Sequence, residues 1–247
     1  MITSNVLTRV FLMRYQNISG TCFTIDVDGK QYLITAQHVI KGISTAARIH
    51  IYQDGWKPFD VTLVGKCGDD NDLTEIGNFG ESIDIAVLAL EHPLFQQTFP
   101  LEPTPTGVCY GQDAYFLGFP SYLNYKLRMD NGFPIPFVRK AVISYMVPND
   151  NELGLKRFYL DGHNNPGFSG GPVIFRDVNN PLDFEYRVAA VISGFVRSDE
   201  PVYEEFDGKQ RTVHKTSWQY NTGIVVAECI NFAVEKIKSN PIGCKVD

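Results

Sequence analysis

The sequence lacks the cysteine patterns that would place it among disulfide-stapled or zinc-binding proteins. Its 247 residues include five cysteines, an odd number, with no C-x-x-C pair and no Cys/His cluster at zinc-ligand spacing. Several of them stand in apolar runs, as Cys22 does before Phe23. We therefore expect five free thiols that act as small core residues in a reducing compartment, and no metal site.

Long apolar runs and an excess of positive charge are also missing. No stretch approaches the roughly 18 uncharged apolar residues of a membrane span, and segment 5–14 has a charge in its middle, unlike a signal peptide. The 22 basic residues are outnumbered by 28 acidic ones, a net charge of −6, so neither nucleic acid nor an anionic lipid surface is an expected partner. We expect a soluble cytoplasmic protein that requires no cofactor.

Short strand-like runs bounded by turn residues dominate the chain, and 44% hydrophobic residues suffice for a sizeable core. Two of these runs flank Asp28-Gly29, a strong hairpin signal. A proline-rich stretch at 100–107 separates two blocks of strands. Only the last segment has a helical period, with Val226, Ile230 and Ile237 on one face. This pattern predicts paired β-barrels with a terminal helix rather than an α/β sheet.

A serine stands among glycines in Gly167-Phe168-Ser169-Gly170-Gly171-Pro172, directly before an apolar strand. Glycines at such a place let the backbone turn sharply and direct N–H groups inward, as the oxyanion hole of an acyl-transfer enzyme requires. A glycine-rich turn with a bystander serine would give the same pattern. The motif alone therefore does not decide between the two.

A histidine and an aspartate stand beside two other apolar strands. His38 follows the strand that ends at Thr35, and Asp84 opens the strand Asp84-Ile85-Ala86-Val87-Leu88. Alone, each is what a strand end or a turn commonly carries. Together with Ser169 they supply a nucleophile, a base to take its proton and a carboxylate to orient the base. A cleft between two barrels would bring the three together.

These three segments resemble the signatures of chymotrypsin-like (trypsin-like) serine peptidases. Asn165-Pro166-Gly167 before the serine and Gly118-Phe119-Pro120 are similar to the HtrA-type branch of that family. The similarity extends from about Gly20 to the terminal helix. It implies an all-β fold of two six-stranded antiparallel β-barrels, with an N-terminal barrel at 1–100, a linker at 101–108, a C-terminal barrel at 109–222 and a C-terminal α-helix at 223–240.

The resemblance also implies the role of each candidate residue. The activity would be that of a serine endopeptidase, which hydrolyses peptide bonds of a peptide or protein substrate through an acyl-enzyme. Ser169 would be the nucleophile, His38 the general base and Asp84 the group that orients it. The backbone N–H groups of Gly167 and Ser169 would form the oxyanion hole.

Signals for substrate specificity conflict. Alignment through the serine puts His163 and Asn164 near the base of the pocket for the residue before the scissile bond, where polar groups favour a polar or acidic side chain. Ser193 and Gly194 belong to a strand that would line the substrate channel and pair with an extended peptide. Segment 197–221, predicted to be a loop beside the cleft, contains five acidic residues that would favour basic peptides. The preferred side chain stays open.

Departures from the family pattern concern regulation. Phe168 stands where zymogen-activated relatives carry an aspartate, and a phenyl ring cannot form an ion pair with a new N-terminal ammonium. Activation by N-terminal cleavage is therefore not expected. The 78 residues after Ser169 suffice only to complete the second barrel and add one helix, so a PDZ-like domain is not expected either. We expect a constitutive enzyme or one whose active-site loops are ordered by a partner protein.

Two other functions fit parts of the pattern. The motif around Ser169 also satisfies G-x-S-x-G of α/β-hydrolases, but a helix should then follow the serine, whereas Pro172 and a β-branched strand follow it here. This argues against a hydrolase of that fold. A latent or catalytically silent barrel that acts as a partner-controlled binding module remains the alternative, because a fold does not guarantee a function.

Overall fold

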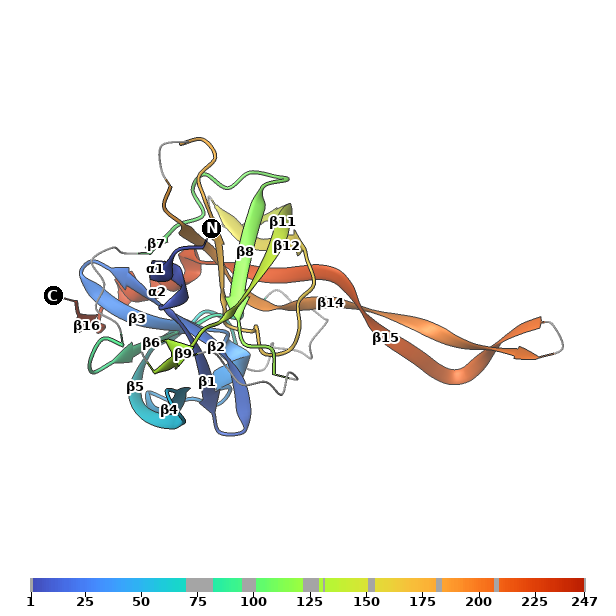
Figure 1. The fold of residues 1–247 in the computed structure, drawn as a ribbon, viewed down its shortest axis with the longest axis horizontal. Helices are drawn as coiled ribbons and strands as arrows, with labels where there is room; N and C mark the ends of the chain where they lie inside the picture. The colour runs from blue at the N-terminus through green and yellow to red at the C-terminus, as the bar shows by residue number, and fades with distance from the viewer. Residues whose placement is uncertain are drawn as a thin grey trace.

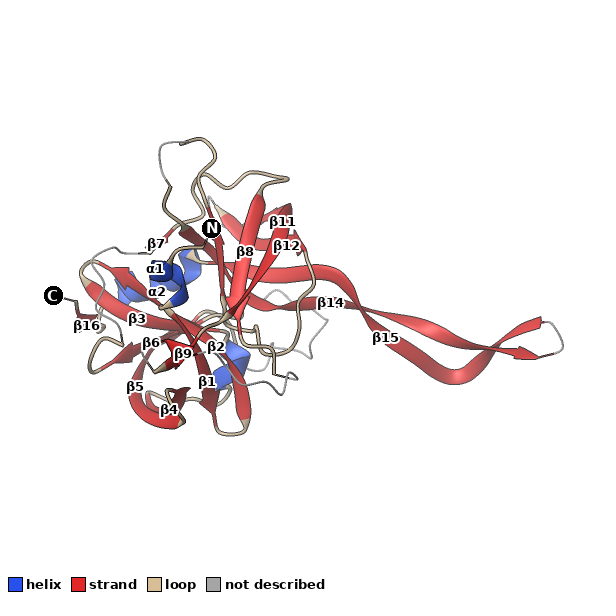
Figure 2. Cartoon of the chain, in the orientation of Figure 1, coloured by secondary structure: helices blue, strands red, loops and turns tan. Residues whose placement is uncertain are grey.

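The computed structural model of the chain describes residues 2–69, 82–94, 101–121, 129–130, 132–150, 154–180, 184–206 and 209–246. Strands dominate it (Figure 2). Besides them there are α1 (Ser4–Leu7), the 3-10 turn η1 (Gln37–Ile40) and α2 (Asn231–Ser239). No helix within these ranges is long and apolar enough to cross a membrane.

Six strands of the N-terminal half close into an antiparallel barrel (Figure 1). They are β1 (Val10–Tyr15), β2 (Ile18–Val27), β3 (Lys30–Thr35), β4 (Ala46–Tyr52), β5 (Trp56–Lys66) and β6 (Ala86–Leu90). The order is β3-β2-β1-β4-β5-β6, and pairing of β3 with β6 closes the ring. Asp28 and Gly29, both with positive φ, make the predicted turn between β2 and β3.

Six strands of the C-terminal half form a second closed barrel. They are β8 (Asp113–Gly118), β11 (Phe137–Pro148), β12 (Leu155–Asp161), β13 (Pro172–Phe175), β14 (Arg187–Phe206) and β15 (Lys209–Cys229). The order is β13-β8-β11-β12-β15-β14, and pairing of β13 with β14 closes the ring. The prediction of two six-stranded barrels is confirmed.

Three short pairings complete the fold. β7 (Glu102–Pro103), in the linker, runs parallel to the start of β14. β9 (Met129–Asp130) and β10 (Phe133–Pro134) form a separate hairpin. β16 (Cys244–Lys245) returns the end of the chain to the first barrel, where it pairs with β3.

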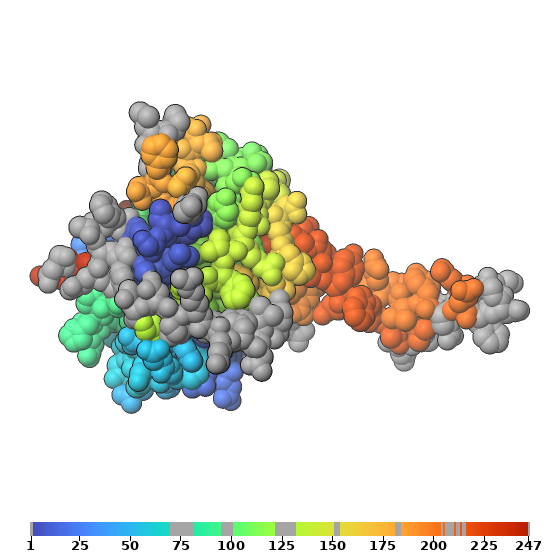
Figure 3. All heavy atoms as spheres, viewed as in Figure 1, coloured from blue at the N-terminus to red at the C-terminus, as the bar shows by residue number. Residues whose placement is uncertain are grey.

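Two predicted boundaries need correction. The terminal helix does not begin at residue 223, because residues up to Cys229 complete β15, and those from Val225 to Cys229 are buried in the second barrel. Segment 197–221 is not a loop but the outer part of a ribbon formed by β14 and β15, which pair as far as Phe206 and Lys209. Figure 3 shows this part, residues 197–206 and 209–221, projecting from the rest of the molecule. We call it the arm.

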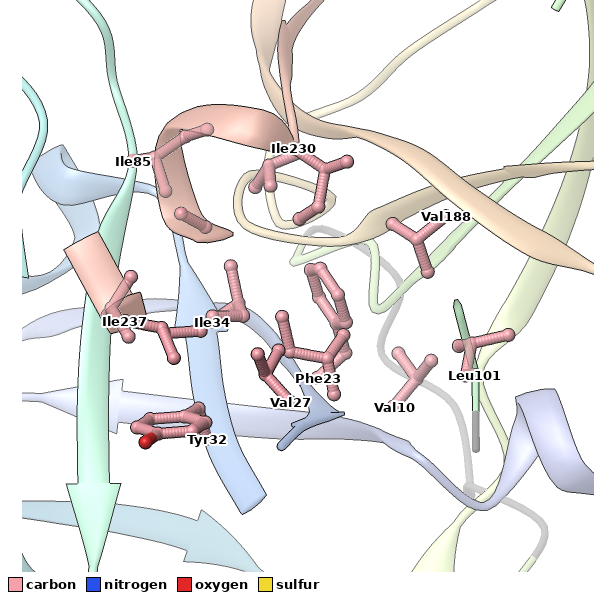
Figure 4. Packing of buried hydrophobic residues seen from close by; sticks show 14 of the residues in the cluster. Val10, Phe23, Val27, Tyr32, Ile34, Ile85, Leu101, Val188, Ile230 and Ile237 are labelled. Carbon is pink, nitrogen blue, oxygen red and sulfur yellow. The ribbon is translucent and has the colours of Figure 1, made fainter. Parts of the chain in front are cut away.

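One apolar cluster joins the two barrels. Phe23 and Ile34 of the first barrel belong to the same cluster as Val188 of the second, and Ile230, just before α2, belongs to it too (Figure 4). Leu101 of the linker is 1% exposed in the same cluster, so the linker is packed rather than loose. Burying this apolar surface between the barrels fixes their relative position, and with it the junction that carries the candidate site.

Candidate active site

His38 is held by Asp84 within the first barrel. β3 ends at Thr35 and η1 then presents His38, while Asp84 stands two residues before β6. Asp84 Oδ2 lies 2.5 Å from His38 Nδ1, and Asp84 Oδ1 accepts the backbone N–H of His38 at 2.9 Å. The two carboxylate oxygens therefore hold the backbone and the ring of His38 at the same time. The imidazole is oriented through Nδ1, which leaves Nε2 for another partner.

Burial and charge act in opposite directions on His38. Partial burial disfavours the imidazolium, whereas the charge and hydrogen bond of Asp84 favour it and raise the pKa of His38 above its ordinary value of 6.5. The side chains remain accessible, with 30% of His38 and 11% of Asp84 exposed. Such a histidine can take up a proton from a bound group.

The turn that carries Ser169 is bonded to β14 and packed against the first barrel. Gly170 N–H donates to the Ile192 carbonyl at 2.7 Å, and Ile192 N–H donates to the Gly171 carbonyl at 2.8 Å. Gly170 has a φ of +85°, and a Cβ added there would lie only 2.8 Å from the backbone nitrogen of Ala36. Only glycine combines this backbone conformation with this close approach.

Backbone contacts place the serine turn beside the histidine turn. Thr21 N–H donates to the Ser169 carbonyl at 2.9 Å. A Cβ on Gly20 would lie 3.1 Å from that same carbonyl and 2.8 Å from Val39, the residue after His38. The segments around the three candidate residues therefore meet at the barrel junction, two from the first barrel and one from the second.

The serine turn leaves hydrogen-bonding groups open. Gly167 has a φ of +103°, and its carbonyl accepts the Thr21 hydroxyl at 2.7 Å. Among the described residues, no acceptor takes the N–H groups of Gly167 and Ser169, and the Ser169 hydroxyl has no hydrogen bond to His38 or to any other described group. Two backbone donors and one hydroxyl of the serine turn are thus without a hydrogen-bond partner among the described residues.

Three of the four residues predicted to bind substrate form hydrogen bonds within the second barrel. Asn164 is 1% exposed, and its side-chain amide donates to the Gly194 carbonyl at 2.9 Å, so that carbonyl is already satisfied. Its backbone carbonyl accepts the Asn221 amide at 2.6 Å. Ser193 Oγ donates to the Val226 carbonyl at 3.1 Å. These contacts brace β14 against its neighbours, whereas the side chain of His163 is exposed.

A buried ion pair that sequence reasoning missed supports the Asp84 segment. Arg157 of β12 and Glu228 of β15 are paired neighbours, with Arg157 Nε 3.0 Å from both Glu228 oxygens. Arg157 Nη2 also donates to the carbonyl of Ser82, two residues before Asp84, at 3.2 Å. This hydrogen bond ties the second barrel to the segment of the first barrel that precedes Asp84. Burial raises the pKa of Glu228 to about 7, although Arg157 opposes the shift.

Phe168, the residue before the serine, is part of the second core. Its ring is fully buried and meets Phe116 edge-on with 5.2 Å between ring centroids. The Arg139 guanidinium lies 5.7 Å from the Phe168 ring and donates to Asn165 at 2.8 Å. Packing thus anchors the turn at the position where an ion pair would hold it in zymogen-activated relatives.

A family model described as a trypsin-like peptidase domain matches residues 20–179. The chain belongs to this family. The match covers the strands that carry all three candidate residues, from the one before His38 to the one after Ser169. No curated protein shows significant sequence similarity to this trypsin-like peptidase domain.

Solved structures share its fold. The Rv3671c protease of M. tuberculosis H37Rv, in its inactive form, is 19% identical with a TM-score of 0.54, and the match covers 96% of this chain and 91% of that one. The HtrA-type protease AlgW, solved with a tripeptide, is also 19% identical with a TM-score of 0.54, over 96% of this chain and 61% of AlgW. At such identities the likeness concerns the fold alone.

Proposed function

We propose that this trypsin-like peptidase domain is a serine endopeptidase with His38, Asp84 and Ser169 as its catalytic triad. The observation that carries the proposal is that Asp84 contacts both the ring nitrogen and the backbone N–H of His38. These contacts lie at the junction where the serine turn packs against the first barrel. A carboxylate so placed fixes the tautomer of a general base and stabilises its protonated form. Peptides or proteins are then the substrates.

The mechanism uses groups of this chain alone. Ser169 Oγ attacks the scissile carbonyl while His38 Nε2 takes its proton, and His38 then gives that proton to the leaving amine. Asp84 stays ionised throughout. The N–H groups of Gly167 and Ser169 hold the oxyanion, a contribution of about 2.7–4 kcal/mol per donor. Water hydrolyses the acyl-enzyme by the same steps in reverse order.

Control by a partner and a cytoplasmic location are parts of the same proposal. The burial of Phe168 supports regulation without N-terminal cleavage, because no carboxylate stands there to bind a new terminus. All five cysteines are free thiols, in keeping with a reducing compartment. A partner that orders the turn around Ser169 would bring its hydroxyl into hydrogen-bonding distance of His38.

One observation favours a second candidate, a latent or silent module that binds without cleaving. The Ser169 hydroxyl is not hydrogen-bonded to His38. In a peptidase without bound substrate such contacts are often long and tighten only in the complex, so the same observation also fits an active enzyme.

A fluorophosphonate probe separates the two candidates. The purified chain is exposed to the probe and analysed by intact and peptide mass spectrometry, with Ser169→Ala and Cys22→Ser as controls. We expect one adduct on Ser169 that is absent in Ser169→Ala and retained in Cys22→Ser, since Cys22 is buried and its thiol pKa is raised. An unlabelled but folded protein, with and without cell extract, would contradict catalysis and favour the silent module.

A further inference from the structure

Arg157 connects the second barrel to the segment that carries Asp84. It stands on β12 opposite Glu228 of β15, and its Nη2 atom lies 2.8 Å from a Glu228 oxygen. The same Nη2 atom donates to the Ser82 carbonyl at 3.2 Å. A buried guanidinium is unfavourable unless its partners stand in good geometry. Arg157 and the Ser82 carbonyl therefore fix each other's position, two residues before Asp84.

The same ion pair is joined to the serine turn through β14. Glu228 stands opposite Val191 of that strand. The next residue, Ile192, exchanges two backbone hydrogen bonds with the two glycines after Ser169. The nucleophile and the carboxylate that orients its base lie on different barrels, so their relative placement depends on contacts between the barrels. The Arg157–Glu228 pair supplies such a contact, and it begins on the strand next to the one that holds the serine turn.

The histidine turn contacts the same segment. Gln37, which precedes His38, is buried, and its side-chain amide bonds both backbone groups of Gly68. Nε2 donates to the Gly68 carbonyl at 2.9 Å, and Oε1 accepts the Gly68 N–H at 3.0 Å. Gly68 packs so closely on the segment before Asp84 that an added Cβ would lie 2.5 Å from the Ile83 carbonyl. The segment is thus held by the histidine turn as well as by the second barrel.

Charge also links the ion pair to the triad. Burial raises the pKa of Glu228, Arg157 opposes this shift, and the negative charge of Asp84 adds to it. The two carboxylates are therefore close enough to repel each other, and Arg157 offsets that repulsion. Removing Arg157 alone would leave Glu228 without its cation near Asp84, whereas removing both charges would not.

We propose that Arg157, held by Glu228, is a positioning residue of the triad, which sets through the Ser82 carbonyl where Asp84 meets His38. The inference rests on the proposed peptidase function. Arg157 acts through Ser82 rather than on the reacting atoms, so its loss should slow proton transfer to His38 without changing how substrate binds. An ion pair that serves stability alone would have no such effect on rate.

Three variants separate positioning from stability. Arg157→Met removes the contact with Ser82 and leaves Glu228 buried without its cation. Arg157→Met/Glu228→Leu removes the same contact together with the lone charge, so it should be much more stable than Arg157→Met. Arg9→Met is the matched control, because Arg9 is fully buried and pairs with Asp26 at 2.8 Å. Asp26 stands opposite Gln31, at the end of β3 away from the histidine turn.

Steady-state kinetics give the first readout, with a peptide substrate chosen by library profiling. Both Arg157 variants should lower kcat about ten- to a hundredfold and leave KM within about twofold of the wild type. The acidic limb of their kcat/KM profiles should move to lower pH, because a displaced Asp84 supports the imidazolium less. Arg9→Met should keep the wild-type kcat and pH profile. A double variant with wild-type kcat and an unmoved acidic limb overturns the proposal.

A second measurement follows the position of Asp84 without catalysis. NMR titration of ¹⁵N-labelled Ser169→Ala protein reports the pKa of His38, assigned by the signal that disappears in His38→Gln. In this background Arg157→Met/Glu228→Leu should lower the pKa of His38 toward 6.5, and Arg9→Met should leave it unchanged. If the fluorophosphonate probe finds no active serine but this shift occurs, only the peptidase proposal fails. An unchanged pKa of His38 contradicts the role of Arg157, whatever the activity.

Discussion

At the scale of single residues, Asp84 acts on His38 through two atoms with different consequences. Oδ2 meets the ring and Oδ1 meets the backbone N–H. In Asp84→Asn, one of these positions must become an amide that cannot accept from its partner, so the tautomer of His38 is no longer fixed. We expect turnover to fall by about four orders of magnitude in steady-state assays with a stable fold by circular dichroism. A variant with near wild-type turnover would remove Asp84 from the triad.

The same contact sets the pH dependence of activity. The base must be neutral to accept the serine proton, and Asp84 raises the pKa of His38 above 6.5. Activity of the wild type should therefore decline as pH falls through this raised value. In Asp84→Asn the supporting charge is gone, so the acidic limb of the kcat/KM profile should move to lower pH. If the acidic limb of the profile did not move in Asp84→Asn, the titration of a group other than His38 would cause it.

The Arg157–Glu228 pair gives a stability prediction. Both side chains are buried, with 6% and 1% exposed, so removing one partner leaves the other charge uncompensated. Glu228→Ala should lower the free energy of unfolding by about 3–5 kcal/mol in urea titrations at pH 8, where Glu228 is ionised. The paired replacement Arg157→Met/Glu228→Leu should recover most of this loss. If the double replacement destabilised the protein as much as Glu228→Ala does, packing rather than charge would be the cause of the loss.

Sequence motifs predicted which segments gather at the junction, because each needs a specific residue at a strand end. They could not show that Asn164 turns inward to the Gly194 carbonyl. That contact depends on how two distant strands approach each other. Glu228 had a detectable signal, since a carboxylate inside an apolar strand requires a partner, but nothing in the sequence near it identifies Arg157.

At the scale of elements, the prediction from sequence was wrong for two segments: the arm and the run before α2. The arm consists mostly of polar residues, on strands exposed to water, which makes its composition that of a loop. The run before α2 satisfies both a strand period and a helix period, and burial against β12 decided for the strand as far as Cys229.

Shortening the arm tests its independence from the fold. A two-stranded ribbon is marginally stable by itself and takes its order from the barrel at its base. Replacing residues 200–218 by Asn-Gly should leave the melting temperature within about 3 °C of the wild type in scanning calorimetry, because few core contacts are lost. A larger drop would mean that the arm packs on the body in solution.

At the scale of the whole molecule, two closed barrels followed from two blocks of strands and a proline-rich joint, together with the family resemblance. The apolar cluster between the barrels could not be inferred in detail, because each of its residues is also a plausible member of a single-barrel core. Phe23, for example, contributes to the cluster that reaches Val188 of the other half. Such a shared core couples the halves energetically.

One cooperative transition is therefore expected for both barrels. Phe23→Ala should lower the free energy of unfolding by about 3–5 kcal/mol and shift the single calorimetric peak without splitting it. Equal calorimetric and van't Hoff enthalpies in both proteins would support this coupling. Two resolved peaks, only one of which moves in the variant, would show that the halves unfold separately.

The return of β16 to the first barrel has a consequence for protein engineering. The last residues cross from one half to the other, where Cys244 pairs with Gln31. A backbone cut in the exposed part of the linker, near Thr106, would therefore leave two fragments that stay associated through the pairing of β16 with β3 and through the shared core. If substitutions weakened the pairing of β16 with β3 and each fragment were fused to one of two interacting proteins, the fragments would form a split reporter whose signal appears only when they reassemble.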